Sequence, residues 1–431
     1  MSALRIGVDF GTTNSSIAVA RADGQVEMAT FPHAGSVVES YRSLLYLDQV
    51  KERGVSRIKS WSGPAAIEEY LAAETKGRLI QSLKSFLSSR SLNSTEVFGR
   101  RMTLQDLIAR ILRDLREKAE AHFGSRIETA VVGRPVRFVG AEKDEDNNFA
   151  EERLRAAFEA AGYHSIEFEL EPVAAAQHYE SSLDRDELIL IGDFGGGTSD
   201  FSLLRVGPSI RTRGRSPSDL LGNSGVGIAG DAFDARIVRN LVSPALGRGS
   251  SAQSMNKILP AVPNWVYSKL EHWHHLSFLR TSTVMNMLKT TKATAFEPGK
   301  IEALMHLIKE DLGYELHRSV QQVKYVLSKD PAASFRFSDG VVEIEAAVRR
   351  TEFEEWIAEE LARIERCVDS LIESSGASPK DVDRVFLTGG SSFVPAVRRI
   401  FETRFGADRI RSGNEFTSVA RGLALSAAHR G

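Results

Sequence analysis

One stretch of the sequence combines carboxylates, glycines and a hydroxyl side chain. A short apolar segment leads into it, and the polar residues are Asp193, Gly195, Gly196, Gly197, Thr198 and Asp200. Glycines let backbone N–H groups approach a bound anion without a Cβ clash, and successive N–H groups in a tight turn form an anion-binding nest. A carboxylate beside such a nest suits Mg²⁺, which prefers oxygen ligands. The pattern predicts a phosphate and magnesium site, with a ligand-free hairpin as the alternative.

The beginning of the chain repeats this plan. An apolar segment reaches Asp9, and a second apolar segment follows a turn that contains Gly11, Thr12, Thr13 and Asn14. Two copies of one phosphate turn, far apart in the sequence, indicate a duplicated lobe with nucleotide between the halves. No GK[ST] follows either turn, which excludes the Walker pattern, and each turn leads into a strand, unlike the dinucleotide fingerprint.

A third glycine turn lies near the end of the chain. An apolar strand pattern over 384–387 leads to Gly389, Gly390 and Ser391, and the helix expected next has Pro395 in its first turn. Paired glycines there would let an adenine or a ribose lie flat on the backbone. Taken alone, the pattern is more often an ordinary strand–helix corner.

Together the three turns resemble those of the actin, sugar-kinase and heat-shock-chaperone ATPase superfamily. Finer motifs are similar to the DnaK-type chaperones: Asp9–Asn14, Glu171–Ala176, Gly230–Asp234, a lysine at the position of the catalytic lysine (Lys84), and the pair Lys324 and Ser328. Two further segments, Val132–Phe138 and Leu220–Gly225, look closer still to the YegD-type bacterial branch, which has no attached peptide-binding domain.

The resemblance implies an α/β, actin-like ATPase fold with two duplicated ribonuclease-H-like lobes. Lobe I is expected over 1–187, with a peripheral subdomain at about 41–103. Lobe II is expected over 188–431, with a peripheral subdomain at about 236–315. The final helix is expected over Phe416–Ala428, with no C-terminal peptide-binding domain after it.

The resemblance also implies ATP or ADP with Mg²⁺ as ligands and assigns roles to individual residues. Lys84 would lie near the γ-phosphate, Glu171 would orient water, and Thr198 would help to place the nucleophile. Magnesium would be held, mostly through water, by Asp9, Asp193 and Asp200. The phosphates would be bound by Gly11, Thr12, Thr13, Asn14, Gly195, Gly196, Gly197 and Thr198. The adenosine side would comprise Gly230, Asp231, Gln321, Lys324, Tyr325, Ser328, Gly389, Gly390, Ser391 and Phe393.

The adenosine side departs from the family pattern at three of these positions. Gln321 stands where the family has a glutamate for the ribose hydroxyls, and Tyr325 and Phe393 replace two arginines that flank the adenine. A tyrosine and a phenylalanine can still stack on a base.

Three functions fit these residues. The first is a chaperone-like ATP hydrolase whose slow turnover drives lobe closure and signals to an unidentified protein partner or co-chaperone. The second is a small-molecule (sugar-type) kinase on the same fold, which needs an acceptor pocket with a general-base aspartate. The third is a nucleotide-binding scaffold with little turnover. Fold analogy alone does not decide among the three functions.

Composition narrows the class of protein. The 431 residues are too many for one simple core, and the net charge of −2 argues against general nucleic-acid binding. A single cysteine, Cys367, rules out a disulfide within the chain. No signal peptide and no membrane-spanning apolar run is visible, so we expect a cytoplasmic protein that does not bind membranes.

Four local predictions can be compared with the structure. A helix should begin after Thr103, capped with the help of Asp106, and end at Gly124. Residues 140–150 should form an exposed loop. One long helix should span about 302–328, and Thr351 with Glu354 should form a capping box.

Overall fold

The computed structural model describes residues 4–33, 36–52, 55–73, 77–180, 183–254, 257–272, 276, 279–412 and 418–429. The chain divides into two compact units. Unit 1 comprises Met1–Ala229, Ile364–Ser392 and Arg398–Gly431, and unit 2 comprises Gly230–Arg363 and Phe393–Val397. Both sheets that carry the expected phosphate turns belong to unit 1.

The first of these sheets has the strand order β13-β12-β1-β2-β3, and β6 also pairs with β2. Its strands are β1 (Leu4–Phe10), β2 (Asn14–Ala20), β3 (Val26–Met28), β6 (Tyr41–Arg42), β12 (Ile127–Arg134) and β13 (Ser165–Leu170). The β1–β2–β3 part is antiparallel, whereas β12 and β13 run parallel to β1. The β1–β2 hairpin turn is the stretch that contains Gly11.

The second sheet repeats this arrangement in the order β16-β15-β14-β21-β22. Its strands are β14 (Glu187–Phe194), β15 (Ser199–Val206), β16 (Leu220–Val226), β21 (Arg384–Thr388) and β22 (Ile410–Ser412). The β14–β15–β16 part is antiparallel, and β21 and β22 run parallel to β14. The duplication inferred from the two glycine turns is therefore visible in whole sheets.

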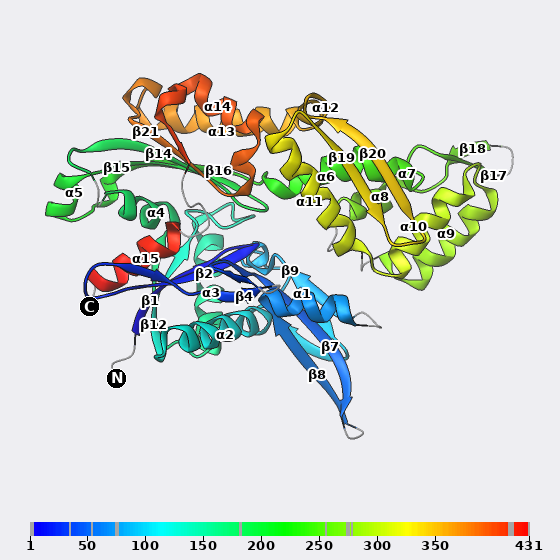
Figure 1. The fold of residues 1–431 in the computed structure, drawn as a ribbon, viewed down its shortest axis with the longest axis horizontal. Helices are drawn as coiled ribbons and strands as arrows, with labels where there is room; N and C mark the ends of the chain where they lie inside the picture. Colours follow the sequence, from blue (N-terminus) through cyan, green and yellow to red (C-terminus); the bar gives the residue numbers. More distant parts are fainter. Residues whose placement is uncertain are drawn as a thin grey trace. The chain divides into compact units, whose positions relative to one another are not determined.

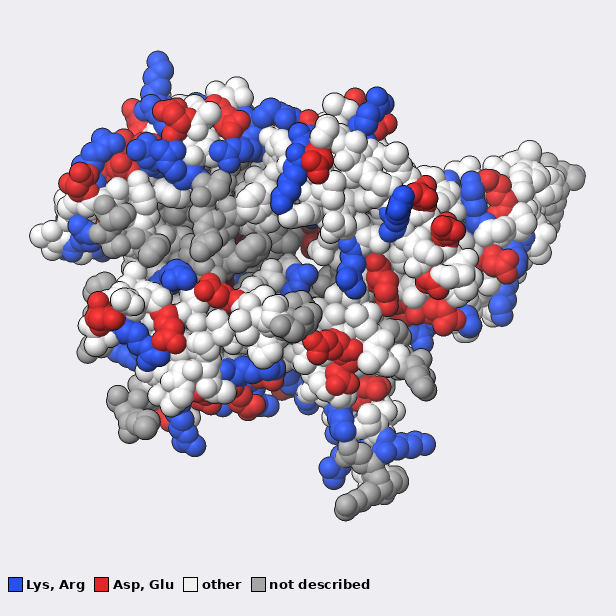
Figure 2. Space-filling view, viewed as in Figure 1, with Lys and Arg blue, Asp and Glu red and all other residues white. Residues whose placement is uncertain are grey.

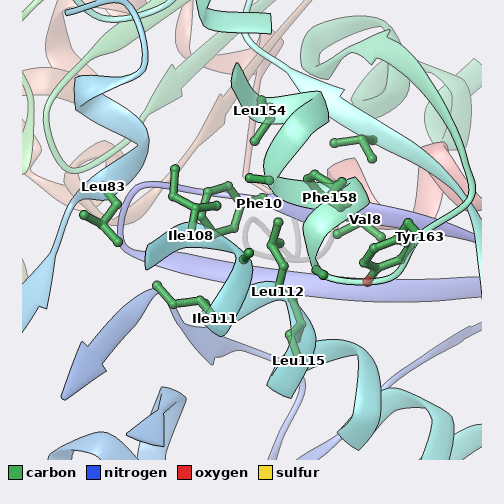
Figure 3. Close-up of a cluster of buried hydrophobic side chains, with 14 of the residues drawn as sticks. Val8, Phe10, Leu83, Ile108, Ile111, Leu112, Leu115, Leu154, Phe158 and Tyr163 are labelled. Atoms are coloured by element: carbon green, nitrogen blue, oxygen red, sulfur yellow. The ribbon is translucent and has the colours of Figure 1, made fainter. Parts of the chain in front are cut away.

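Two long helices, α2 (Leu104–Phe123) and α3 (Asp144–Ala160), cover one face of the first sheet. Their apolar side chains meet Val8 and Phe10 of β1 in the largest described core (Figure 3). The Thr103–Asp106 capping box and the left-handed Gly124 at the other end of α2 confirm the predicted helix limits. Fully buried Leu112 lies in this core.

A peripheral part of unit 1 lies between β3 and α2 in the sequence. It contains β4 (Phe31–His33), β5 (Ser36–Val38), β7 (Leu44–Glu52), β8 (Val55–Ser62), α1 (Gly63–Ala72), β9 (Arg78–Gln81), β10 (Ser94–Val97) and β11 (Arg100–Thr103). The long β7–β8 hairpin pairs with β9, and its two strands extend away from the rest of unit 1 (Figure 1). After β9 the chain forms a short 3₁₀ helix, Leu83–Phe86.

Two helices link the two sheets of unit 1. On α4 (Glu171–Glu180), Val173 packs against the second sheet, whereas Ala174 packs against α15 (Ser418–His429), which covers the other face of the first sheet. The contact is close, because a Cβ at Gly422 of α15 would lie 1.7 Å from the carbonyl oxygen of Ala174. Glycine is therefore required at this helix crossing.

Further helices flank the second sheet. Phe401 of α14 (Pro395–Phe405) contacts Phe194 and Phe201 of that sheet, and Leu371 of α13 (Ala358–Ser375) lies against β16. The short helix α5 (Pro208–Arg213) follows β15. The second sheet is thus covered on both faces, as expected for a strand as apolar as β14.

Unit 2 consists mainly of helices with two small hairpins. Its helices are α6 (Gly230–Ile237), α7 (Ser243–Ala245), α8 (Asn264–Leu270), α9 (Ser282–Thr294), α10 (Pro298–Lys309), α11 (Gly313–Lys329), α12 (Arg350–Trp356) and the first turns of α13. Its hairpins are β17 (Ser251–Ser254) with β18 (Lys257–Pro260), and β19 (Ala332–Ser338) with β20 (Glu343–Arg349).

Three local predictions were wrong. The 140–150 segment is not a loop throughout, because α3 begins at Asp144: the Asp146 side chain accepts from the Lys143 amide, and Asn147 holds the preceding segment through Phe138. The helix expected over 302–328 is broken between α10 and α11, where Asp311 has a φ of 54°.

The third error concerns the start of α12. Arg349, not Thr351, is the N-cap residue: its amide donates to Oε2 of Glu352 at 2.8 Å, and Thr351 lies inside the helix. The final helix begins at Ser418, and Phe416, where we placed its start, lies outside the described residues.

Candidate nucleotide-binding site

The two duplicated turns close in the same way. In the first, Phe10 pairs with Ser15, and a Cβ at Gly11 would lie 2.2 Å from the carbonyl oxygen of Asn14. In the second, Phe194 pairs with Ser199, and the Gly195 amide donates to the Thr198 carbonyl at 2.9 Å. A side chain at position 11 would clash with the backbone, so glycine is required there. Both turns are tight and lie directly at the end of the strand that carries the aspartate.

The Lys84 ammonium reaches the start of α4. Its Nζ lies 2.6 Å from Oε1 of Glu171, and the two side chains are 8% and 15% exposed. Neighbouring Leu83 is buried in the core that α2 also lines (Figure 3), so Leu83 anchors the 3₁₀ helix that carries Lys84 to this core. The structure therefore brings together a lysine and a glutamate that are 87 residues apart in the sequence.

Charged groups around this ion pair shift one another's pKa values. Burial would lower the pKa of Lys84, but Glu171, Asp9 and Asp193 outweigh that effect and raise it. Burial raises the pKa of Asp9 to about 8, with Glu171 and Asp193 adding to the rise and Lys84 opposing it. Asp9 and Asp193, from the ends of two different strands, thus lie in one electrostatic cluster with Lys84.

Each aspartate of the second turn has a hydroxyl partner. Asp193 Oδ1 accepts from Thr388 Oγ1 at 2.8 Å, and Asp200 Oδ2 accepts from Thr198 Oγ1 at 2.9 Å. Burial, the first cause in both cases, raises the pKa of Asp193 and raises that of Asp200 to about 7, against the hydrogen bonds, which lower them. The carboxylates are therefore crowded and short of positive charge.

This cluster fits a cation held through water better than one held directly. Among the residues that the structure describes, no three His, Cys, Asp or Glu side chains are placed to ligate a metal ion together. The raised pKa values of Asp9, Asp193 and Asp200 show that an added positive charge nearby would be favourable. Mg²⁺ usually keeps several of its waters, so indirect binding suits it.

The third glycine turn lies against the second. Gly389 has a φ of +82°, and a Cβ on it would lie 2.0 Å from the carbonyl oxygen of Phe194. The turn continues as a 3₁₀ helix, Gly390–Phe393, in which Ser391 is buried and Ser392 Oγ donates to the Gly389 carbonyl at 2.7 Å. Gly389 is thus needed for close backbone packing, whatever ligand the turn contacts.

Most of the expected adenosine-side residues belong to unit 2. Lys324 of α11 lies 2.7 Å from Oδ1 of buried Asp234 and donates to the Gly230 carbonyl at 3.2 Å. Burial raises the pKa of Asp231 to about 6, and Asp234 adds to the rise. Ser328 Oγ donates to the Lys324 carbonyl at 2.9 Å. The start of α6 and one face of α11 therefore form a second polar cluster.

The three departures from the family pattern differ in exposure. Gln321 is half-buried on α11, one turn before Lys324. Tyr325 and Phe393 are 55% and 53% exposed, which is high for aromatic side chains. The Lys329 ammonium lies 4.1 Å from the centre of the Tyr325 ring. Each aromatic ring presents a surface on which a base could stack.

Some residues of these clusters were missed in the sequence. Thr388 holds Asp193, and its signal was available, because it is the last residue of the strand that precedes the third turn. Asp234 holds Lys324 and lies within the recognised Gly230–Asp234 segment. Ser85, beside Lys84, gave no signal: its Oγ lies 3.9 Å from the position of a Cβ at Gly197.

Two like sheets, each delivering an aspartate and a glycine turn to one charged cluster, define an actin-like α/β ATPase fold. Within that class the chain belongs to the Hsp70 family: the model of the family, described as Hsp70 protein, matches residues 52–250 and 307–430. The family and the fold class expected from the sequence are thereby confirmed.

Similar proteins carry the name Chaperone protein DnaK. The protein from Thermosipho africanus is 25% identical over 427 residues, 98% of this chain and 58% of the relative. That from Deinococcus radiodurans is 25% identical over 433 residues, and that from Thermotoga maritima 24% over 424; each match covers 98% of this chain and 59% of the relative. The chain thus spans under two thirds of these relatives. Within its described part, no helix is long and apolar enough to cross a membrane.

Proposed function

We propose that the chain is a chaperone-type ATPase module that binds ATP with Mg²⁺, hydrolyses it slowly and uses hydrolysis to close its lobes. The observation that carries this proposal is the cluster of Lys84 and Glu171 with Asp9 and Asp193. The first duplicated turn contributes Asp9, and the second contributes Asp193. Phosphoryl transfer needs mainly positioning and charge neutralisation, and this cluster offers both.

In this proposal the two turns hold the phosphates and the metal. The phosphates would accept hydrogen bonds from the turn backbones and from the side chains of Thr12, Thr13 and Asn14. Asp9, Asp193 and Asp200 would hold magnesium through its waters, and magnesium, when bound, would neutralise charge on the phosphate oxygens. Thr388, which donates to Asp193, would keep that carboxylate oriented.

The remaining residues would act on the terminal phosphate and its attacking water. Lys84 would place its ammonium at the γ-phosphate as a point charge, and Glu171 would hold that ammonium and orient water. Thr198, already paired with Asp200, would help to place the nucleophile. The loss of any of these groups should affect turnover more than binding, because they act chiefly in the transition state.

We assign the adenosine to the remaining residues of the set, through the family resemblance: Gly230, Asp231, Gln321, Lys324, Tyr325, Ser328, Gly389, Gly390, Ser391 and Phe393. The polar cluster of α6 with α11 and the exposed rings of Tyr325 and Phe393 support this assignment. We further propose the YegD-type branch within the family, with lobes that divide near residue 187.

The partner would be a protein, such as a co-chaperone, rather than a nucleic acid. On the face shown in Figure 2, basic and acidic side chains are intermixed. A nucleic-acid site would instead require a patch or stripe of positive charge.

Phosphate release from ATP-Mg²⁺ by the purified chain, with and without a panel of small metabolites, tests the proposal. Release of free phosphate without any metabolite supports an ATP hydrolase. ADP formation that requires one metabolite, with the phosphate appearing on it, would replace the proposal with the kinase. Binding of ATP without turnover under any condition would replace it with the scaffold.

A further inference from the structure

The segment that follows Lys84 is held by one buried side chain. Arg153, on α3, is 4% exposed. Its Nη1 donates to the carbonyls of Leu87 at 2.9 Å and Ser89 at 3.0 Å, and its Nη2 donates to the carbonyl of Leu92 at 2.7 Å. A weaker contact reaches the carbonyl of Phe86 at 3.3 Å. One guanidinium thus fixes the backbone from residue 86 to residue 92.

Arg153 has no carboxylate partner within ion-pair distance among the described residues. Burial of an unpaired charge is costly unless hydrogen bonds compensate for it. Here the carbonyl oxygens supply the compensation, with the ring of Phe149 at 5.1 Å from the guanidinium carbon. Movement of the segment would therefore leave a buried cation without its carbonyl partners, which opposes that movement.

Lys84 depends on that conformation. Its 3₁₀ helix spans four residues and follows Ser82, whose φ of 58° is unfavourable for a non-glycine residue. The Leu87 amide, at the end of the helix, donates to the Lys84 carbonyl at 3.2 Å. Leu87 is the residue whose own carbonyl accepts from Arg153. The hydrogen-bond path from Arg153 to the Lys84 backbone therefore passes through a single residue.

We propose that Arg153 is a positioning residue for hydrolysis: by holding the 86–92 carbonyls it keeps the Lys84 ammonium at Glu171. This inference rests on the proposed function. A displacement of about 1 Å in a reacting group can cost on the order of 100-fold in rate, so loosening this segment should lower turnover although Arg153 does not touch the nucleotide.

The test compares Arg153→Met with Arg155→Met. Arg155 lies on the same helix, donates to the Ile166 carbonyl at 2.7 Å and stacks on Phe168, but does not contact the 86–92 segment. Arg153→Met should lower single-turnover hydrolysis by about tenfold or more while ATP affinity changes by less than about threefold. Arg155→Met should change neither.

A double variant separates positioning from general loss of structure. If Arg153 acts through Lys84, Arg153→Met should have no further effect on hydrolysis once Lys84→Met is present. Full additivity of the two substitutions would overturn the proposal, as would unchanged hydrolysis in Arg153→Met alone. Unfolding midpoints of all variants, measured in urea, identify any variant that has lost its fold, and Arg153→Lys then replaces Arg153→Met.

Hydrogen exchange tests the positioning without any turnover. In the nucleotide-free protein, the amides of Ser85 and Leu87 should exchange faster in Arg153→Met than in the wild type or in Arg155→Met, whereas strand β12 should not change. Equal exchange in all three proteins overturns the proposal. If the wild type does not hydrolyse ATP, the proposed function fails, and this comparison still decides whether Arg153 fixes the Lys84 segment.

Discussion

The Lys84–Glu171 pair would serve both stability and catalysis, and one set of variants separates these contributions. At the 2.6 Å separation of Nζ and Oε1, the mutual attraction is about 6 kcal/mol for an effective dielectric constant of about 20. Desolvation of both groups offsets much of this attraction. Lys84→Met keeps the side-chain volume but leaves Glu171 facing Asp9 and Asp193 without a counter-charge. We expect the free energy of unfolding to fall by about 3 kcal/mol.

Adding Glu171→Gln should restore most of that stability, because the stranded charge is then removed. Hydrolysis should not return. Lys84→Met and the double variant should both hydrolyse ATP about 100-fold more slowly than the wild type, as expected when one electrostatic contact to the transition state is lost. The second substitution should therefore restore stability but leave turnover unchanged.

The measurements are urea unfolding of the nucleotide-free proteins by circular dichroism and single-turnover hydrolysis with ATP-Mg²⁺. Glu180→Gln is a control glutamate substitution on the same helix, because Glu180 pairs with Arg215 rather than with Lys84. Undiminished hydrolysis in Lys84→Met would remove Lys84 from the mechanism. Failure of Glu171→Gln to restore stability would refute the argument from a stranded charge.

Three further outcomes are expected. Asp193→Asn should slow single-turnover hydrolysis by about 100-fold and weaken ATP-Mg²⁺ binding in a titration more than Lys84→Met does, because it also weakens the metal site. Gly389→Ala should lower the unfolding midpoint far more than Gly376→Ala, because both glycines have positive φ but only a Cβ at Gly389 meets a backbone carbonyl, at 2.0 Å. The folded-state pKa of Asp9 is raised to about 8, so the protonated Asp9 carboxyl group contributes stability that is fully present below the ordinary carboxyl pKa. That contribution is lost as pH rises toward 8, because the buried group must ionise. In thermal unfolding, Asp9→Asn should therefore stabilise the nucleotide-free protein more at pH 8 than at pH 5.

Much of the fold could be predicted because its signals are local. The Asp9 and Asp193 turns are each bounded by apolar segments of strand length, and these became β1, β2, β14 and β15. The capping residues at Thr103 and Gly124 are equally local and correctly placed α2. In the 140–150 segment, the prediction missed contacts outside the helix: the Asn147 side chain bonds the backbone of residues 136 and 138, which no periodicity reveals.

The charged cluster was predictable only through the family resemblance. Nothing in the spacing of Lys84 and Glu171 indicates a 2.6 Å contact, since 87 residues separate them. Likewise, Arg153 looks like any surface arginine of an amphipathic helix until the 86–92 backbone is placed beside it. Side chains that bind backbone carbonyls far along the chain leave no motif, because a carbonyl is present at every residue.

The position of Glu171 links the site to the architecture of unit 1. It is the first residue of α4, whose Val173 packs on the second sheet and whose Ala174 meets α15 on the first. Packed side chains do not deform continuously, so a change in the angle between the sheets must either break these contacts or move α4 as a body. Lys84, by contrast, is fixed by the core of the first sheet through Leu83 and by α3 through the Arg153 contacts. The 2.6 Å ion pair therefore joins two separately supported groups, and its length is sensitive to how the sheets are set against each other.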